Sequence, residues 1–273
     1  MTDRSCTISA VPELVEGAAV HRTGTGPAIV LLPANGGDAD DFAAIRDRLA
    51  SRHTVYAIDW PGWGAGAPDL SPSALGYAAL LPRILDRLED GPFILLGNSV
   101  GGFAAVLAAA DRPDLVRVLV LVDPGGFTPQ WFGTRLACRV IGSRWLAPTM
   151  MRVLPRLYLR HDTAAVQAIR RHATELSHQP DRVSAFASIW RSFADRDHDA
   201  RGAAARVSAP TLLIWGRRDP VLPWAIDGRR ARRALAHAVI ESLPCGHQAF
   251  AEMPGPFLDT LEAFLATTRT EPA

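Results

Sequence analysis

FILLGNSVGGFAAVLAAA, residues Phe93–Ala110, is an 18-residue run without a charged side chain. A run of that length could in principle cross a membrane as a helix. Five small or polar residues interrupt it, between an apolar half of strand length and an alanine-rich half: Gly97, Asn98, Ser99, Gly101 and Gly102. The pattern therefore predicts a buried strand, a tight turn and a buried helix, and no membrane span.

On both sides of this run, apolar segments of strand length alternate with segments of helical periodicity. The expected strands are 28–32, 54–58, 93–96, 115–122, 211–215 and 238–243. The expected helices are 38–50, 72–88, 100–110, 224–237 and 256–266. Such alternation is typical of βαβ units, whose parallel sheet is covered by helices on both faces. We therefore expect an α/β fold with a mostly parallel central sheet.

Strand-like runs are missing between Pro124 and Arg206, where the sequence predicts several short amphipathic helices. The economical interpretation is one α/β core, residues 1–124 and 207–273, interrupted by a helical insertion over 125–206. The insertion carries 13 Arg and 6 acidic residues, a local charge of +7. Residues 125–161 contain six Arg and no acidic residue. A basic insertion is thus expected on an acidic core.

The basic residues of this chain are all arginine, 29 in number against 28 acidic residues. Without lysine, Schiff-base and pyridoxal-phosphate enzymes, Walker-A ATPases and protein kinases are excluded. A net charge of +1 provides no basic face for sequence-independent nucleic-acid binding. The N-terminal residues include no apolar run typical of a signal peptide.

Three cysteines, Cys6, Cys138 and Cys245, are odd in number, far apart and in no CxxC pair. This spacing predicts neither a disulfide framework nor a zinc site. A reducing, cytoplasmic location fits it best.

Gly97–Gly101 matches G-x-S-x-G at the predicted turn from strand to helix. A nucleophile exposed at the end of a strand needs a turn so sharp that the flanking positions have no room for side chains. Ser99 is therefore the candidate nucleophile. A serine hydroxyl needs a base, and the base needs an orienting acid. His247 and Asp219 each follow a predicted strand, at the sheet edge where ligand sites of parallel sheets collect.

The chain order Ser99, Asp219, His247 resembles that of the α/β-hydrolase-fold serine hydrolases with a helical cap. Further resemblance lies in DWPGWG at Asp59–Gly64, similar to the family's D-x-P-G-x-G loop, in PTLLIWGRRD and in GHQAFAEMP at Gly246–Pro254. It extends from about residue 18 to 268 and implies an α/β-hydrolase fold.

By position, the resemblance implies that Ser99 is the nucleophile, His247 the general base and Asp219 the acid. It implies oxyanion donors at the backbone N–H groups of Val100 and Asn35, and neither a cofactor nor a metal. Pro33-Ala34-Asn35 stands where the family usually has His-Gly-x. We therefore expect this loop to be set differently, with the Asn35 donor retained.

Other acidic residues compete for these roles. Asp123 ends another predicted strand, at the place from which some relatives supply the acid; we expect Asp219 instead and interpret Asp123 as a turn residue. Asp59 is interpreted as capping the loop that follows it. The charged run 195–199, DRDHD, is interpreted as a solvated linker rather than a metal site.

Aromatic and basic side chains raise further alternatives. Trp60 and Trp63 either line the pocket or pack their own loop. Five large residues are expected in the core of the cap rather than in an acyl pocket: Trp131, Phe132, Trp145, Met150 and Met151. Three arginines at i, i+4 spacing share a helix face: Arg152, Arg156 and Arg160. We expect a solvated surface there; the alternatives are an arginine that binds a substrate carboxylate, or a face that meets an acidic partner.

The expected function is that of a serine hydrolase that cleaves a small or medium carboxylic ester. One alternative is carbon–carbon bond hydrolysis of a dienoic acid, because GNSVGG and Asp-Pro-Gly-Gly resemble hydrolases of aromatic ring-cleavage products. Those enzymes generally have Trp where this chain has Gln248. The other alternative is a non-catalytic ligand-binding protein on the same fold, suggested by the altered Pro33-Ala34 loop.

Overall fold

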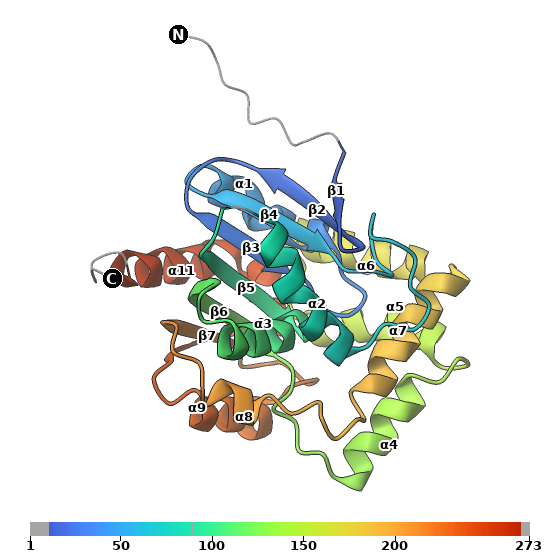
Figure 1. Cartoon of the computed structure of the whole chain (residues 1–273). Coiled ribbons are helices and arrows are strands. Elements are labelled where there is room, and N and C mark those ends of the chain that lie inside the picture. The colour runs from blue at the N-terminus through green and yellow to red at the C-terminus, as the bar shows by residue number, and fades with distance from the viewer. Residues whose placement is uncertain (1–10, 89, 269–273) are drawn as a thin grey trace.

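The computed structural model describes residues 11–88 and 90–268 (Figure 1). The predictions for Cys6 and for the N-terminal residues lie outside this range. Cys138 and Cys245 are both buried and unbonded to other cysteines. Within the described ranges, no helix combines the length and the apolar character needed to cross a bilayer.

An eight-stranded sheet forms the centre, in the order β1-β2-β4-β3-β5-β6-β7-β8. Its strands are β1 (Glu13–Val15), β2 (Ala18–Thr23), β3 (Ala28–Leu32), β4 (Thr54–Asp59), β5 (Phe93–Ser99), β6 (Val116–Pro124), β7 (Thr211–Gly216) and β8 (Val239–Leu243). From β4 to β8 in this sheet order, neighbouring strands are parallel. Strand β1 pairs antiparallel with β2, and β2 pairs antiparallel with β4. The mostly parallel sheet is confirmed; the two antiparallel strands before Ala28 were not predicted.

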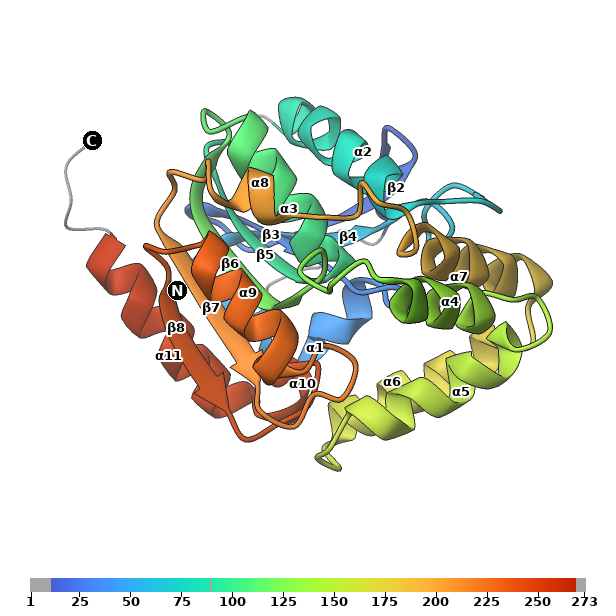
Figure 2. The same cartoon turned by 90° about the horizontal axis from the view of Figure 1, so that it is seen from below.

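Helices cover both faces of the sheet, as Figures 1 and 2 show. One face carries α1 (Ala43–Ala50), α10 (Ala249–Glu252) and α11 (Pro254–Thr268). The other carries α2 (Ala74–Arg87), α3 (Val100–Asp111), α8 (Arg201–Ala204) and α9 (Arg229–Ala234). Each layer packs on its own cluster of buried apolar side chains. Because both faces are covered, the central strands are apolar throughout, which is what made them predictable.

Two predicted helices are each divided in the structure. The segment expected at 38–50 begins with a 3-10 turn, Ala39–Phe42, before α1. The segment expected at 224–237 is a π-helical turn, Trp224–Gly228, followed by α9. A Cβ on Gly228 would overlap the Trp224 ring, so this close packing depends on glycine.

Between β6 and β7 the chain leaves the sheet and forms four helices at its edge (Figure 1). These are α4 (Phe132–Ile141), α5 (Ala147–Tyr158), α6 (Ala164–Leu176) and α7 (Pro180–Ser192), after which α8 packs on α3. The helical character predicted for 125–206 is thus observed.

Helix α7 attaches this insertion to the rest of the molecule. Arg182 donates hydrogen bonds to the carbonyl oxygens of Gly62 and Gly64 in the loop after β4. The Ser192 hydroxyl accepts from the first N–H of α2, at Ala74, over 3.0 Å. The contacts hold α7 over the ends of the central strands.

The aromatic residues of the insertion are placed differently from the prediction. Trp131, Phe132 and Trp145 are exposed rather than packed in a core. Met151 is buried and lines a cavity. Hydrophobic periodicity identified the helices, but it could not say which apolar side chains another element covers.

Candidate active site

Ser99 stands at the turn from β5 into α3 with a backbone conformation that side chains rarely adopt, φ 53° and ψ −116°. A Cβ on Gly97 would lie 2.6 Å from the Gly101 carbonyl oxygen, and one on Gly101 would overlap the Leu32 carbonyl. The backbone segments therefore approach so closely that only glycine fits. This is the strained turn that the G-x-S-x-G spacing predicted.

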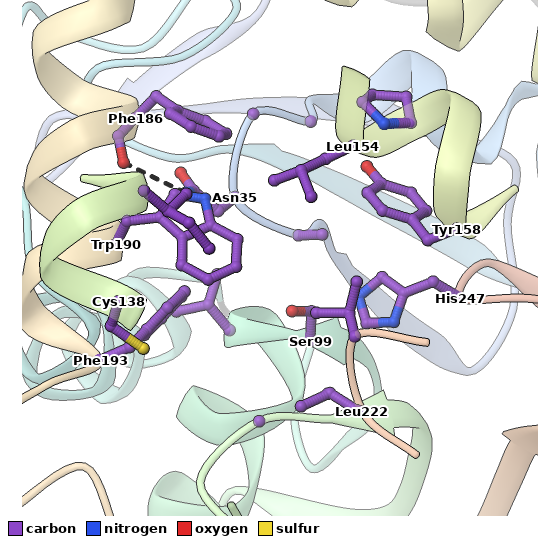
Figure 3. Close-up of a pocket in the computed structure, with 18 of the residues that line it drawn as sticks. Asn35, Ser99, Cys138, Leu154, Tyr158, Phe186, Trp190, Phe193, Leu222 and His247 are labelled. Atoms are coloured by element: carbon purple, nitrogen blue, oxygen red, sulfur yellow. Dashed lines mark hydrogen bonds between the residues drawn. The ribbon is translucent and has the colours of Figure 1, made fainter. Parts of the chain in front are cut away.

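His247 and Asp219 form a buried pair beside this turn. The imidazole Nδ1 and the Asp219 Oδ2 are 2.6 Å apart, and both residues are buried. Asp219 Oδ1 accepts a hydrogen bond from the Val221 N–H at 2.8 Å, which fixes the carboxylate. The His247 ring lies next to Ser99, and both line the same cavity (Figure 3). The structure thus brings together the three predicted residues.

Asp123 lies behind this pair, at the end of β6. Its carboxyl is fully buried and accepts from the Gly216 N–H at 3.0 and 3.1 Å. One ligand atom each of Asp123, Asp219 and His247 fall within 4.8 Å of one another. Burial, and then the negative charge of Asp219, raise the pKa of the Asp123 carboxyl well above its ordinary value. Burial penalises the charged form, so the neutral form of the Asp123 carboxyl is favoured.

The loop after β3 forms another wall of the cavity. Asn35 and Val100 both line it with Ser99. The Asn35 side-chain amide donates to the Phe186 carbonyl of α7 at 3.3 Å (Figure 3), and the Gly37 N–H closes a turn onto the Ala34 carbonyl at 3.1 Å. Within the described part of the chain, the Asn35 backbone N–H has no acceptor, so it is available to a ligand.

The cavity has a volume of about 410 Å³ and lies between Ser99 and the insertion. Its walls on the insertion side are largely apolar and come from α4, α5, α6 and α7 and the residue after α7, including Cys138, Met151, Leu154, Phe186, Trp190 and Phe193. No arginine is among the described residues that line it. The alternative in which an arginine of the insertion binds a substrate carboxylate in the cleft is therefore not supported.

The structure also assigns roles to two tryptophans and an aspartate at the end of β4 and in the loop after it. Trp60 and Trp63 are fully buried outside the cavity, and Trp60 stacks on Tyr77 at 4.7 Å, so both pack their loop. Asp59 accepts from the Ala65 N–H at 2.8 Å and thus caps the loop, as predicted.

His198 corrects the interpretation of 195–199 as a solvated linker. Residues 195–197 are exposed, but His198 is buried, with its ring 4.5 Å from Phe103 and 4.8 Å from Phe193. It lines the cavity, and neither ring nitrogen has a hydrogen-bond partner among the described residues. Burial lowers the pKa of His198 to about 4, so the imidazole is neutral at pH 7.

Glu252 is a functional position that sequence reasoning missed. This buried carboxylate accepts from the backbone N–H groups of Gly246, Arg160 and His161 at 3.0, 2.7 and 3.2 Å. It therefore ties the loop that carries His247 to the end of the insertion's second helix. The motif GHQAFAEMP contained Glu252, but it served only as a sign of family resemblance.

A second carboxyl group, which unlike Glu252 does line the cavity, is also shielded from water. Asp41 lines the cavity and accepts from the Gln248 amide at 3.3 Å. Burial, and then the nearby Asp38 charge, raise the pKa of Asp41 to about 8. Asp38 itself pairs with His172 of α6 at 2.9 Å, a further contact between the core and the insertion.

Comparison with known proteins agrees with the fold. The sequence matches the alpha/beta hydrolase family over residues 29–260, most of its length. The chain belongs to this family. As an α/β hydrolase it is 30% identical to an uncharacterized protein of Mycobacterium tuberculosis, over 92% of this chain and 78% of that protein.

Two further relatives are named for a function. This α/β hydrolase is 29% identical to a 2-hydroxy-6-oxononadienedioate/2-hydroxy-6-oxononatrienedioate hydrolase of Burkholderia vietnamiensis, over 83% of each chain. The crystal structure of a bacterial membrane phospholipase A superposes with a TM-score of 0.79 at 24% identity, covering 97% of this chain and 87% of that one. At 24% identity, the superposition on the phospholipase A structure supports the fold alone.

Proposed function

We propose that this α/β hydrolase cleaves a carboxylic ester with an apolar acyl or alcohol part, by acyl transfer through Ser99. The observation that carries the proposal is the buried His247–Asp219 pair, 2.6 Å apart, next to a serine on a strained turn. A nucleophile, a base and an orienting acid in that arrangement constitute a catalytic triad.

In the proposed reaction, His247 takes the Ser99 hydroxyl proton as the serine oxygen bonds to the ester carbonyl carbon. The backbone N–H groups of Asn35 and Val100 donate to the oxyanion that results. Its collapse breaks the bond to the alcohol oxygen, which receives the proton from His247. A water molecule, deprotonated by His247, then releases the acid and restores Ser99.

The insertion acts in this proposal as a cap over the core formed by residues 1–124 and 207–273. Support comes from the cavity, whose apolar side is built from α4, α5, α6 and α7. An apolar cavity of about 410 Å³ accommodates a medium-sized apolar group. Specificity would therefore be set mainly by the insertion.

Carbon–carbon hydrolysis of a dienoic acid is the second candidate, because the Burkholderia vietnamiensis relative has that type of activity in its name. The substrate of such a reaction carries carboxylates, which bind best to arginine. The absence of arginine from the described residues that line the cavity, and the presence of Gln248 after His247, favour the ester.

Reaction with a fluorophosphonate probe tests the proposal. We expect prompt labelling of the wild type and of Ser51→Ala, an exposed serine, but none of Ser99→Ala. Turnover of nitrophenyl esters of increasing acyl length, measured beside a dienoic diacid, then ranks the two chemistries. Folded wild type that neither labels nor turns over any ester would refute catalysis and favour the ligand-binding alternative.

A further inference from the structure

Helix α4 has two different apolar faces. Thr134, Cys138 and Ile141 point to the cavity and line it. Phe132, Leu136 and Val140 are spaced by four residues, so they form one stripe along the helix. Their exposed fractions are 78%, 49% and 48%, so the stripe faces solvent. Figure 1 shows α4 at the edge of the molecule.

In the sequence, an exposed tryptophan lies beyond each end of this stripe. Trp131 precedes the first turn of α4 and is 66% exposed, and Trp145 follows the helix and is 79% exposed. Exposed apolar side chains that form a contiguous patch usually mark an interaction surface. Tryptophan is especially frequent where a protein meets the headgroup region of a bilayer.

The chain segment that carries the stripe holds charged side chains of one sign only. Residues 125–161 hold six arginines and no acidic residue, and among the described residues none of those six guanidinium groups forms an ion pair with a carboxylate. Arg139 is exposed beside the stripe, and the Arg144 guanidinium lies over the Trp145 ring, 4.4 Å from its centre. These arginines are therefore free to pair with a negatively charged partner.

We propose that the outer face of α4 binds the surface of an anionic lipid bilayer. The side chains of Phe132, Leu136 and Val140 enter the acyl boundary, the tryptophans lie at headgroup level and Arg139 pairs with lipid phosphate. A second copy of this chain fits less well, because a symmetric contact through α4 would bring like-charged arginines together.

Lipid contact through α4 would place the bilayer close to the cavity, because the opposite face of the same helix lines it. A helix with its side chains is about 10–12 Å thick. An apolar ester dissolved in the bilayer would thus lie within about one helix diameter of the cavity. The surface itself does not require the chemistry of Ser99, so binding is measurable in a protein without hydrolase activity.

Co-sedimentation of Ser99→Ala protein with vesicles tests the proposal. One set of vesicles contains phosphatidylcholine alone and the other phosphatidylcholine with phosphatidylglycerol. We expect binding to the anionic set only, weakened by added salt. Phe132→Asp should reduce affinity at least about tenfold, and Arg139→Gln about fivefold.

Matched controls keep this test specific. Leu70→Asp changes an exposed apolar residue outside the insertion, and Arg232→Gln changes an exposed arginine of α9; both should bind as tightly as the parent protein. Equal binding to the two vesicle sets, or full binding by Phe132→Asp and Arg139→Gln, would overturn the proposal. So would a dimer in sedimentation velocity that Phe132→Asp abolishes, because it would assign α4 to a second copy.

Discussion

Asp219 and Asp123 both lie close to His247, yet we expect them to contribute differently to catalysis. The imidazole is hydrogen-bonded to Asp219, whereas Asp123 is fully buried and its raised pKa favours the neutral carboxyl. Asp219→Asn would remove the charge that orients and stabilises the imidazolium, so we expect kcat to fall about 10³–10⁴-fold. Asp123→Asn replaces a neutral acid by a neutral amide of the same shape.

Steady-state turnover of a nitrophenyl ester by the two variants decides between these carboxyls. Asp123→Asn should retain activity within about tenfold, because an amide can still donate to Asp219. Equal melting temperatures would show that the comparison is between folded proteins. A large loss in Asp123→Asn with little loss in Asp219→Asn would reassign the acid to β6.

His198 should make the folded protein sensitive to acid. Its pKa is lowered to about 4 in the folded state, and in the unfolded chain a histidine takes up its proton near pH 6.5. The unfolded state therefore binds more protons between these values, and stability falls as the pH drops through this window. From about pH 7 to about pH 5, wild type should lose about 2 kcal/mol more of its unfolding free energy than His198→Phe.

Urea denaturation at the two pH values measures this difference. His178 is exposed, so His178→Phe should show the acid sensitivity of the wild type. If the unfolding free energy of His198→Phe depended on pH as that of the wild type does, the buried imidazole would take up its proton in the folded state, and the prediction would be wrong.

At the residue scale, the sequence predicted Ser99, Asp219 and His247 because each follows a strand and occurs in the chain order of a known family. Glu252 and His198 were not predictable in the same way. Their environments are formed by residues distant in the chain: Glu252 binds Arg160, 92 residues away, and His198 packs on Phe103. No local pattern distinguishes a buried histidine in a charged run from a solvated one.

The turn between β5 and α3 allows a test at the scale of an element. A Cβ on Gly101 would overlap the Leu32 carbonyl of β3, and backbone atoms of a central strand cannot easily move. Gly101→Ala is therefore expected to lower the unfolding free energy by more than about 2 kcal/mol and to slow labelling of Ser99. A Cβ on Gly202 of α8 would meet no atom within 4 Å, so Gly202→Ala should be neutral or stabilising by up to about 1 kcal/mol.

Chemical denaturation and fluorophosphonate labelling rates of the two glycine variants provide the measurement. A Gly101→Ala protein as stable and as reactive as Gly202→Ala would contradict the close approach of helix and sheet.

Elements were predictable where their burial is uniform. Strands β3 to β7 are continuous apolar runs or nearly so, because helices cover both of their faces. By contrast, β1 has only three residues and β2 mixes His21 and Arg22 with apolar residues. Trp131 and Phe132, at the start of α4, were expected in the core of the cap but are exposed, since an apolar side chain on a helix does not reveal what covers it.

At the scale of the whole molecule, Arg182 is expected to hold the insertion in place. Arg182→Met would leave the Gly62 and Gly64 carbonyls without their donor and should lower the unfolding free energy by about 1–3 kcal/mol. Because α7 carries Phe186 and Trp190 into the cavity wall, KM for an apolar ester should rise more than kcat falls.

Arg171→Met provides the matched control, because Arg171 is an exposed residue of α6. We expect the melting temperature and the steady-state kinetic constants of Arg171→Met to be close to those of the wild type. An Arg182→Met protein with an unchanged KM would show that the contacts of α7 with the loop after β4 do not shape the cavity.

The sheet order has a consequence for the growing chain. In the folded protein β6 lies between β5 and β7, yet Thr211 of β7 comes 87 residues after Pro124 of β6. At about 5–20 residues per second, a ribosome needs roughly 4 to 17 s to make that segment. Throughout this interval the valine-rich edge of β6 is unpaired and open to other nascent chains. Synonymous codons that slow translation of the insertion are therefore expected to lower the yield of native protein without any change in its sequence.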